Sequence, residues 1–219
     1  LLSAPVVSPE GRLLGRITVD DVVDVIRDEA DHSVMSMAGL DEDADMFAGV
    51  VPSARRRGLW LGVNLATAFL AAWVVGLFET TIQNIVALAV LMPIVASMGG
   101  VAATQTLTLI VRGLALGQVE RTNARWLMTK EFAVALLNGL AWATVVAVVA
   151  MLWFRNWKIA GVIFAAMVVN LVAAALAGVA VPLVLKRFGV DPAMAGGVIV
   201  TTVTDVVGFA SLLGLGTLL

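Results

Sequence analysis

The pattern of apolar and polar positions divides the chain into a mixed N-terminal part and a long apolar remainder. After residue 57, five mostly apolar segments follow one another, separated by short polar turns. A helix needs about 20 apolar residues to cross the hydrocarbon core of a bilayer. The pattern therefore predicts five transmembrane helices, at residues 58–78, 82–116, 128–154, 159–185 and 192–219.

Composition points to the same class of protein. Of the 219 residues, 60% are hydrophobic and 14% are charged, and the mean hydropathy is +0.99. These values exclude an ordinary soluble domain and indicate an all-α polytopic membrane bundle. The chain has no cysteine, which excludes disulfides and thiolate metal sites, and its single histidine makes a His-based zinc or haem site improbable.

The basic residues predict the orientation of the bundle. From residue 55 onward, nine of them lie directly before the first span or around the turns between spans two and three or four and five, and only Arg155 and Lys158 fall on the other side. Cytoplasmic loops carry the excess of lysine and arginine. We therefore expect a multi-pass protein of the cell (inner) membrane, with its N-terminus in the cytoplasm and its C-terminus outside.

The N-terminal 30 residues predict a strand, a turn, a second strand and a helix. Thr18 followed by Asp21 is typical of a helix capping box, with aspartate in the place of Glu or Gln. Residues 31–51 predict an amphipathic helix, with Gly39 as a possible break, and Pro52 marks a turn before the first span.

The first helix is unusually acidic. Asp20, Asp24 and Asp28 recur every four residues, so they share one face, where like charges repel. A solvated surface is one interpretation. A weak sensor of divalent cations is the other, because a bound cation would remove the repulsion. The candidate regulatory metal ligands are Asp20, Asp21, Asp24, Asp28 and Glu29.

The second span contains residues that disturb helices. Pro93 and the pair Gly99-Gly100 lie within its apolar run. They indicate a kink or break that lines a cavity, since irregular backbone at this depth needs protein or water around it. Helix packing through small residues is an equally good interpretation.

The last span carries Asp205 within a run that has no other charge from Pro192 to Leu219. Helical spacing places Gly197, Thr201, Asp205 and Gly208 on one stripe, as in the lining of a pore. In the interior of the predicted spans, away from their ends, we find no base to pair with Asp205 and no second acid, which argues against an intramembrane aspartyl protease. A cation is the expected counter-charge.

Several motifs together resemble the MgtE family of magnesium transporters and channels. They are Gly99-Gly100 with Gln105, Thr108 to Arg112, Lys130-Glu131, Leu136 to Gly139, Asp191-Pro192, and Thr201 to Gly208. The resemblance implies a homodimer with a pore on its two-fold axis, lined by spans two and five. It also implies that Asp205 selects Mg²⁺, with an added oxygen from the Thr201 carbonyl, and that Pro93, Gly99, Gly100 and Gln105 line the pore.

The N-terminal pattern of Pro5 to Asp21 resembles the end of a CBS domain. The resemblances imply that residues 1–30 end such a domain, 31–54 form a connecting plug helix, and 55–219 form the pore domain. We expect upstream sequence that completes a CBS pair, with a possible nucleotide there, and closure when cytosolic Mg²⁺ binds the acidic region. Mn²⁺ or Co²⁺ transport and a non-conducting receptor remain alternatives; enzymatic activity and nucleic-acid binding are not expected.

Overall fold

The five predicted spans are present as long helices in the computed structural model. It describes residues 2–40, 47–119 and 122–219, apart from the side chains of residues 29, 30 and 33. The predicted features Asp41, Glu42, Asp43, Asp45 and Arg121, and the side chain of Glu29, therefore lie outside what is described. The membrane-length helices are α2 (Val50–Gly76), α4 (Val86–Ala115), α5 (Ala124–Phe154), α6 (Trp157–Arg187) and α7 (Pro192–Gly216).

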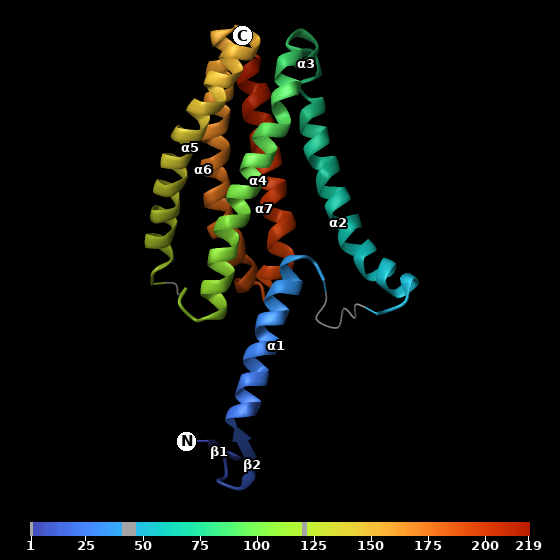
Figure 1. The fold of residues 1–219 in the computed structure, drawn as a ribbon, viewed down its shortest axis with the longest axis vertical. Helices are drawn as coiled ribbons and strands as arrows, with labels where there is room; N and C mark the ends of the chain where they lie inside the picture. The colour runs from blue at the N-terminus through green and yellow to red at the C-terminus, as the bar shows by residue number, and fades with distance from the viewer. Residues whose placement is uncertain (1, 41–46, 120–121) are drawn as a thin grey trace.

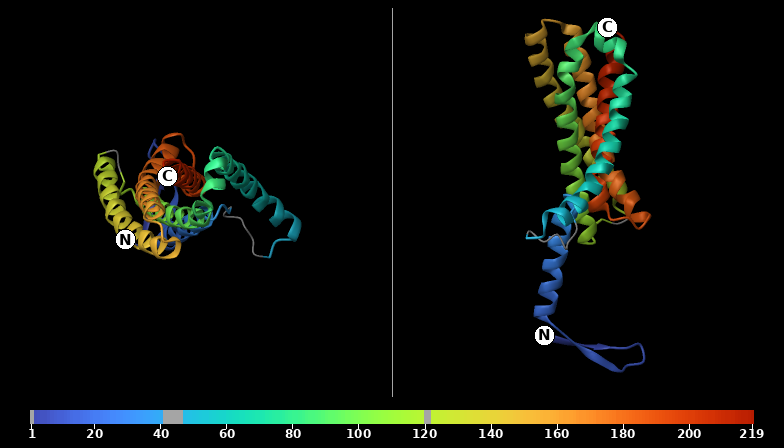
Figure 2. Two further views of the ribbon diagram at one scale, coloured as in Figure 1. Left: turned by 90° about the horizontal axis from the view of Figure 1, so that it is seen from above. Right: turned by 90° about the vertical axis from the view of Figure 1, so that its right-hand side faces the viewer.

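Helix α6 is the centre of the bundle. It packs along α5, α4 and α7, and α4 also packs along α7 (Figure 1). Its side chains Ile163, Ala166 and Met167 are fully buried in the main hydrophobic core. In contrast, α5 leans on α6 and hardly touches α4, and α2 lies at the opposite side of the bundle, where it packs on α7 (Figure 2). The prediction of an all-α membrane bundle is confirmed.

Helix α4 is continuous through Pro93 and Gly99-Gly100, so the break expected there is absent. The chain is interrupted earlier, at Ile85, which separates the short helix α3 (Glu79–Asn84) from α4. This division accounts for part of the unusual length of the second apolar segment, which was predicted at residues 82–116. Gly99 is buried against α6 and α7, and packing through a small residue is the interpretation that fits it.

The N-terminal strands and the helix start agree with the sequence pattern. Strands β1 (Ser3–Val7) and β2 (Leu13–Thr18) pair antiparallel and lead directly into helix α1 (Val19–Met37). Both halves of the predicted capping box are formed at Thr18 and Asp21. The hairpin and the first half of α1 expose their apolar side chains, including Leu13, Leu14 and Ile26. This part of the chain has no core of its own among the described residues.

Two expected boundaries lie elsewhere. Helix α1 runs unbroken across position 30/31 and ends before Gly39, whose positive φ of 68° terminates it in the conformation that glycine adopts most easily. Helix α2 begins at Val50, eight residues before the predicted start, because Pro52 sits in its first turn rather than in a preceding turn. Proline is tolerated there, since the N–H groups of the first turn have no helical partner.

The capping box makes the start of α1 sensitive to pH. The Thr18 hydroxyl and backbone N–H each donate to Asp21 Oδ2 at 2.7 Å, and these bonds lower the pKa of Asp21. The carboxylate is the bonded form, so the cap stabilises α1 above the ordinary aspartate pKa. This stabilisation is lost as the pH falls through the lowered pKa.

We predict that Thr18→Ala raises the pKa of Asp21 toward its ordinary value and frays the first turn of α1, because the hydroxyl bonds are lost. Thr18→Ser keeps the hydroxyl and serves as the matched control. The measurement is an NMR titration of the Asp21 carboxyl carbon in detergent-solubilised protein. An unchanged titration midpoint in Thr18→Ala would contradict this account of the cap.

Candidate functional site

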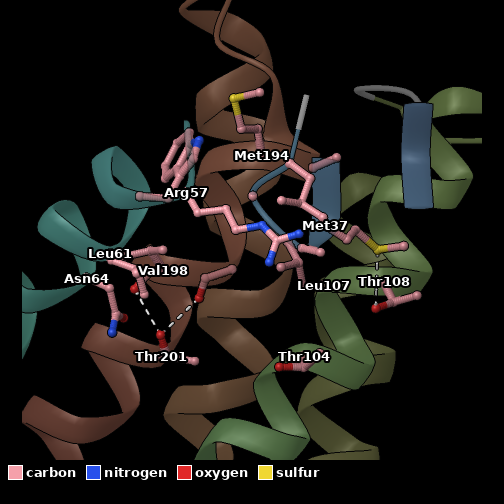
Figure 3. Close-up of a pocket in the computed structure, with 16 residues that line it drawn as sticks. Met37, Arg57, Leu61, Asn64, Thr104, Leu107, Thr108, Met194, Val198 and Thr201 are labelled. Atoms are coloured by element: carbon pink, nitrogen blue, oxygen red, sulfur yellow. Dashed lines mark hydrogen bonds between the residues drawn. The ribbon is translucent and has the colours of Figure 1, made fainter. Parts of the chain in front are cut away.

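A cavity of about 630 Å³ opens where the end of α1 meets α2, α4 and α7. Figure 3 shows its lining, with Met37 at the end of α1 directed toward Thr108 of α4. The Thr108 hydroxyl lies 3.9 Å from the Met37 sulfur, and the Trp60 ring lies close to Gly39. The end of α1 thus closes one side of the cavity.

The floor of the cavity is polar. It includes Asn64 of α2, Thr104 and Thr108 of α4, and Thr201 of α7. The Thr104 and Thr201 hydroxyls donate back to carbonyls of their own helices, at 2.8 Å and 3.0 Å, so these side chains meet their hydrogen-bonding needs inside an apolar protein. Threonine hydroxyls that are bonded in this way still offer oxygen lone pairs to a guest in the cavity.

Arg57 is the single charged residue in the lining of this cavity as far as the chain is described. Figure 3 shows its side chain extending into the space between Met37 and Thr201. The neighbouring Arg55 does not line the cavity. A guanidinium is always protonated, so Arg57 places a fixed positive charge at the opening.

Asp205 lies one helical turn beyond Thr201 and near the middle of α7. Residues four apart share a helix face and are about 6 Å apart along the axis, so the Asp205 carboxyl continues the line of Gly197 and Thr201. Asp205 is partly exposed in the single chain. No described lysine or arginine forms an ion pair with it, which leaves the carboxylate without a protein counter-charge in this part of the chain.

The other residues predicted to line a pore do not all lie on the face that carries Gly197, Thr201 and Asp205. Gly208 and Gly99 are buried and face α6, where Asn170 fills the space between them. Gly197 borders the cavity, whereas Pro93 and Gly100 lie on a more exposed face of α4. The stripe predicted for α7 thus splits in two, with Gly208 behind Asp205 rather than beside it.

The Thr201 carbonyl is already a hydrogen-bond acceptor. It accepts from the Thr204 hydroxyl at 2.9 Å, and a carbonyl at this position of an α-helix also faces the N–H four residues on, that of Asp205. With both lone pairs engaged, this oxygen is poorly placed to bind an ion directly. Contact through a water molecule suits it better.

A second intramembrane acid escaped the sequence analysis. Glu131 lies near the start of the predicted span 128–154 and was not considered there, but it is part of α5 and is only 6% exposed. It accepts from the Thr106 hydroxyl at 3.3 Å and lies 3.3 Å from the Lys130 ammonium. The interpretation of Asp205 as the one acid in the spans is therefore wrong, although Glu131, unlike Asp205, has partners.

Gln105 faces the same region as Glu131. Both line a separate cavity of about 210 Å³ between α4, α5 and α6. Gln105 is therefore not in the lining of the cavity that contains Thr201. The signal that could have identified this second site is the pair Lys130-Glu131, because adjacent opposite charges at the start of a span tolerate partial burial.

The acidic face of α1 does not form a preassembled metal site. Asp20, Asp21, Asp24 and Asp28 are exposed, and among the described residues no three histidine, aspartate or glutamate side chains converge. Near the other end of α1, His32 Nε2 lies 3.5 Å from Asp191 Oδ2. Asp191 also caps α7 by accepting from the Ala193 N–H at 2.9 Å, so this contact ties α1 to the start of α7.

These features define a multi-pass membrane protein with a threonine-containing cavity that reaches α7 one turn from a carboxylate without an ion pair to a described base. Residues 92–215 match the MgtE family, which is described as divalent cation transporter. The match covers more than half of the chain, and the chain belongs to this family.

Relatives in three bacteria carry the name magnesium transporter MgtE. The Bacillus subtilis protein is 30% identical over 216 residues, 99% of this chain and 48% of that protein. The Thermus thermophilus protein is 33% identical over 98% of this chain and 48% of its own length. The Enterococcus faecalis protein is 31% identical over 93% and 45%. The chain thus spans about half the length of these relatives.

We predict that Arg57→Gln increases divalent cation flux a few-fold at low ionic strength, because a positive charge at the cavity opening repels a doubly charged ion. The increase shrinks at high salt, where the repulsion is screened. Arg55→Gln removes a charge two residues away and outside the cavity lining, and is the matched control. The measurement is ion uptake by proteoliposomes; equal effects of the two variants would contradict a local role of Arg57.

Proposed function

We propose that this chain transports Mg²⁺ across the membrane, as a homodimer whose pore runs along the two-fold axis between the α4 and α7 helices of both subunits. The observation that carries the proposal is Asp205: a carboxylate near the middle of a membrane helix, partly exposed in the single chain, with no ion pair to a described base. The relatives' shared name supports Mg²⁺ as the substrate.

The chemistry of Mg²⁺ suits such a pore. The ion demands octahedral oxygen coordination and gives up water reluctantly. Two Asp205 carboxylates facing each other across the axis supply a charge that balances one hydrated ion. The hydroxyls of Thr104, Thr108 and Thr201 offer oxygen toward its water shell. Selection then acts on a largely hydrated ion, through the width of the pore and its charge, and Thr201 contributes through water.

A broader divalent transporter is the second candidate. A site that contacts its ion through water discriminates weakly among hydrated ions of similar size, so Mn²⁺ and Co²⁺ compete in the same assay. The family's description as divalent cation transporter favours keeping this candidate. A non-conducting receptor with a CBS sensor is disfavoured by the uncompensated Asp205, and absence of any flux in liposomes would revive it.

We further propose that cytosolic Mg²⁺ closes the pore through α1. The end of α1 lines the cavity through Met37 and Gly39, and the acids of α1 line up on its exposed face. Bridging cations hold α1 in place when Mg²⁺ is abundant, and repulsion releases it when Mg²⁺ is scarce. The exposed apolar surface of the hairpin and α1 supports the view that residues 1–30 are the end of a CBS domain, whose complete pair would offer a nucleotide site.

The position of the chain in the membrane follows from the same proposal. The bases at the α1 end of the bundle support a cytoplasmic location of this end, and the C-terminus of α7 lies at the other end of the helices (Figure 1). The cell membrane is the proposed location. In this orientation the cavity opens toward the cytosol, and Asp205 lies between it and the outside.

We predict that Asp205→Asn reduces Mg²⁺ uptake by proteoliposomes to the background leak, because the pore loses its counter-charge. The same variant keeps or increases its thermal stability, since removing a charge from the bilayer centre relieves a cost of about 3 kcal/mol on insertion scales. Glu79→Gln, an acid of the outer helix α3, is the control. Wild-type uptake by Asp205→Asn would refute the assignment.

We predict that neutralising Asp20, Asp24 and Asp28 together by asparagine shifts closure to higher cytosolic Mg²⁺, because fewer bridging carboxylates remain on α1. The measurement is channel current or flux as a function of Mg²⁺ on the α1 side. Glu10→Gln removes an exposed acid from the hairpin turn and controls for net charge. A closure midpoint that stays unchanged would contradict a regulatory role of this face.

A further inference from the structure

Asn170 is an amide in the middle of α6 that is fully buried between α4 and α7. Its Nδ2 donates to the Val95 carbonyl of α4 at 2.8 Å. Its Oδ1 is buried and has no hydrogen-bond partner among the described residues. Helix α6 does not line the proposed pore, and no role described so far uses this side chain.

Two glycines, one on each pore helix, make room for this amide. A Cβ added at Gly208 of α7 would lie 2.8 Å from Asn170 Nδ2 and 2.9 Å from Val95 Cγ1, and a Cβ added at Gly99 of α4 would overlap Asn170 Nδ2. Real Cβ atoms do not approach so closely, so both positions require glycine as long as Asn170 is present. The amide therefore touches α4 and α7 at the same level.

The same level contains the selective part of the proposed pore. Gly208 follows Asp205 by three residues, and Thr204, which precedes Asp205, is fully buried with its Cβ near Gly99. The back of the α7 turn that carries Asp205 thus rests on the Val95–Gly99 turn of α4, and the Asn170 amide lies between them. A shift of this contact moves Asp205 relative to the pore-side face of α4.

An amide is a costly way to fill this space. An apolar side chain would leave no orphaned polar atom, whereas Asn170 leaves Oδ1 without a partner in an apolar interior. Space filling alone therefore does not account for the residue. The hydrogen bond from Nδ2 to the Val95 carbonyl does, because it fixes the position of α6 along α4 in a way that apolar contacts do not.

We propose that Asn170 is a positioning residue: its amide, held between Gly99 and Gly208 and bonded to Val95, sets the register of α4 against α7 and so the distance of Asp205 from the pore axis. The inference rests on the proposed function, because its readout is ion transport. It extends that function by assigning ion preference to a side chain outside the pore.

The test compares Asn170→Leu, Asn170→Asp and wild type in proteoliposomes with Mg²⁺ and Mn²⁺ as separate substrates. Thermal unfolding in detergent is measured alongside. Asn170→Leu keeps the branched shape, although its methyl groups are larger, and loses the bond. Asn170→Asp keeps the shape, and at mildly acidic pH its neutral carboxyl can donate to Val95. Asn138→Leu, an exposed asparagine of α5, is the control for loss of a membrane amide.

We expect the Mg²⁺-to-Mn²⁺ flux ratio of Asn170→Leu to change by about three- to tenfold, the range expected for one interhelical hydrogen bond in a membrane, with little change in unfolding temperature. Asn170→Asp at acidic pH keeps the wild-type ratio, and so does Asn138→Leu. A folded Asn170→Leu protein with the wild-type ratio would overturn the inference, even if both fluxes fell equally, because the residue would then be merely structural.

Two further outcomes keep the test decisive. If Asn170→Leu does not fold, Asn170→Asp at acidic pH decides: a wild-type ratio there, where the neutral carboxyl can donate to Val95, supports the inference, and an altered ratio there overturns it. If the wild-type chain itself carries no Mg²⁺, the proposed function fails first. That result is distinct from a wild type that transports and an Asn170→Leu variant that matches it.

Discussion

An uncompensated carboxylate in the hydrocarbon region is the constraint on which the arrangement of this molecule depends. Asp205 costs free energy wherever the bilayer is its only surroundings, by about 3 kcal/mol on insertion scales. The protein supplies no base to reduce this cost within the described residues. The remaining ways to reduce it are water and a passing cation, and both require a polar route to the side chain. The cavity that Thr104, Thr108 and Thr201 line reaches α7 one turn from Asp205.

The helices α4 and α7 keep their arrangement around the cavity because α6 packs against both of them. Helix α6 packs against α4, α5 and α7, whereas α2 packs on α7 at the opposite side of the bundle. Glu131, in contrast to Asp205, is buried and has partners: it accepts a hydrogen bond from Thr106 and forms an ion pair with Lys130. The bundle therefore contains two carboxylates with opposite surroundings. Glu131 has its partners inside the bundle, and Asp205 is partly exposed with no ion pair to a described base.

The sequence predicts those features that depend on residues near one another in the chain. Five apolar runs of membrane length became five helices, and Thr18 with Asp21 formed the predicted cap. Features that depend on neighbouring helices were missed. Nothing near Asn170 in the sequence indicates that two glycines will face it. Gly99 suggested a break because local propensity cannot register the helix packed against it, and Lys130-Glu131 suggested a loop because charge dominated the local pattern.

The site residues divide in the same way. Asp205 and Thr201 could be identified from helical spacing, because both lie on one face of a single helix. Gln105 and Gly208 share motifs with the pore residues but face α5 and α6, and only the packing angles decide that.

The close packing of Gly99, Asn170 and Gly208 has a consequence for the evolution of the sequence. Three helices supply one residue each, and no two of them are adjacent in the gene. A methyl group gained at either glycine would crowd Asn170, and a smaller residue at 170 relieves only part of this, because Gly208 also faces Val95 and Gly99 also faces Thr204. Divergence at these three sites is therefore coupled, so that related genes inherit the trio together or replace it together.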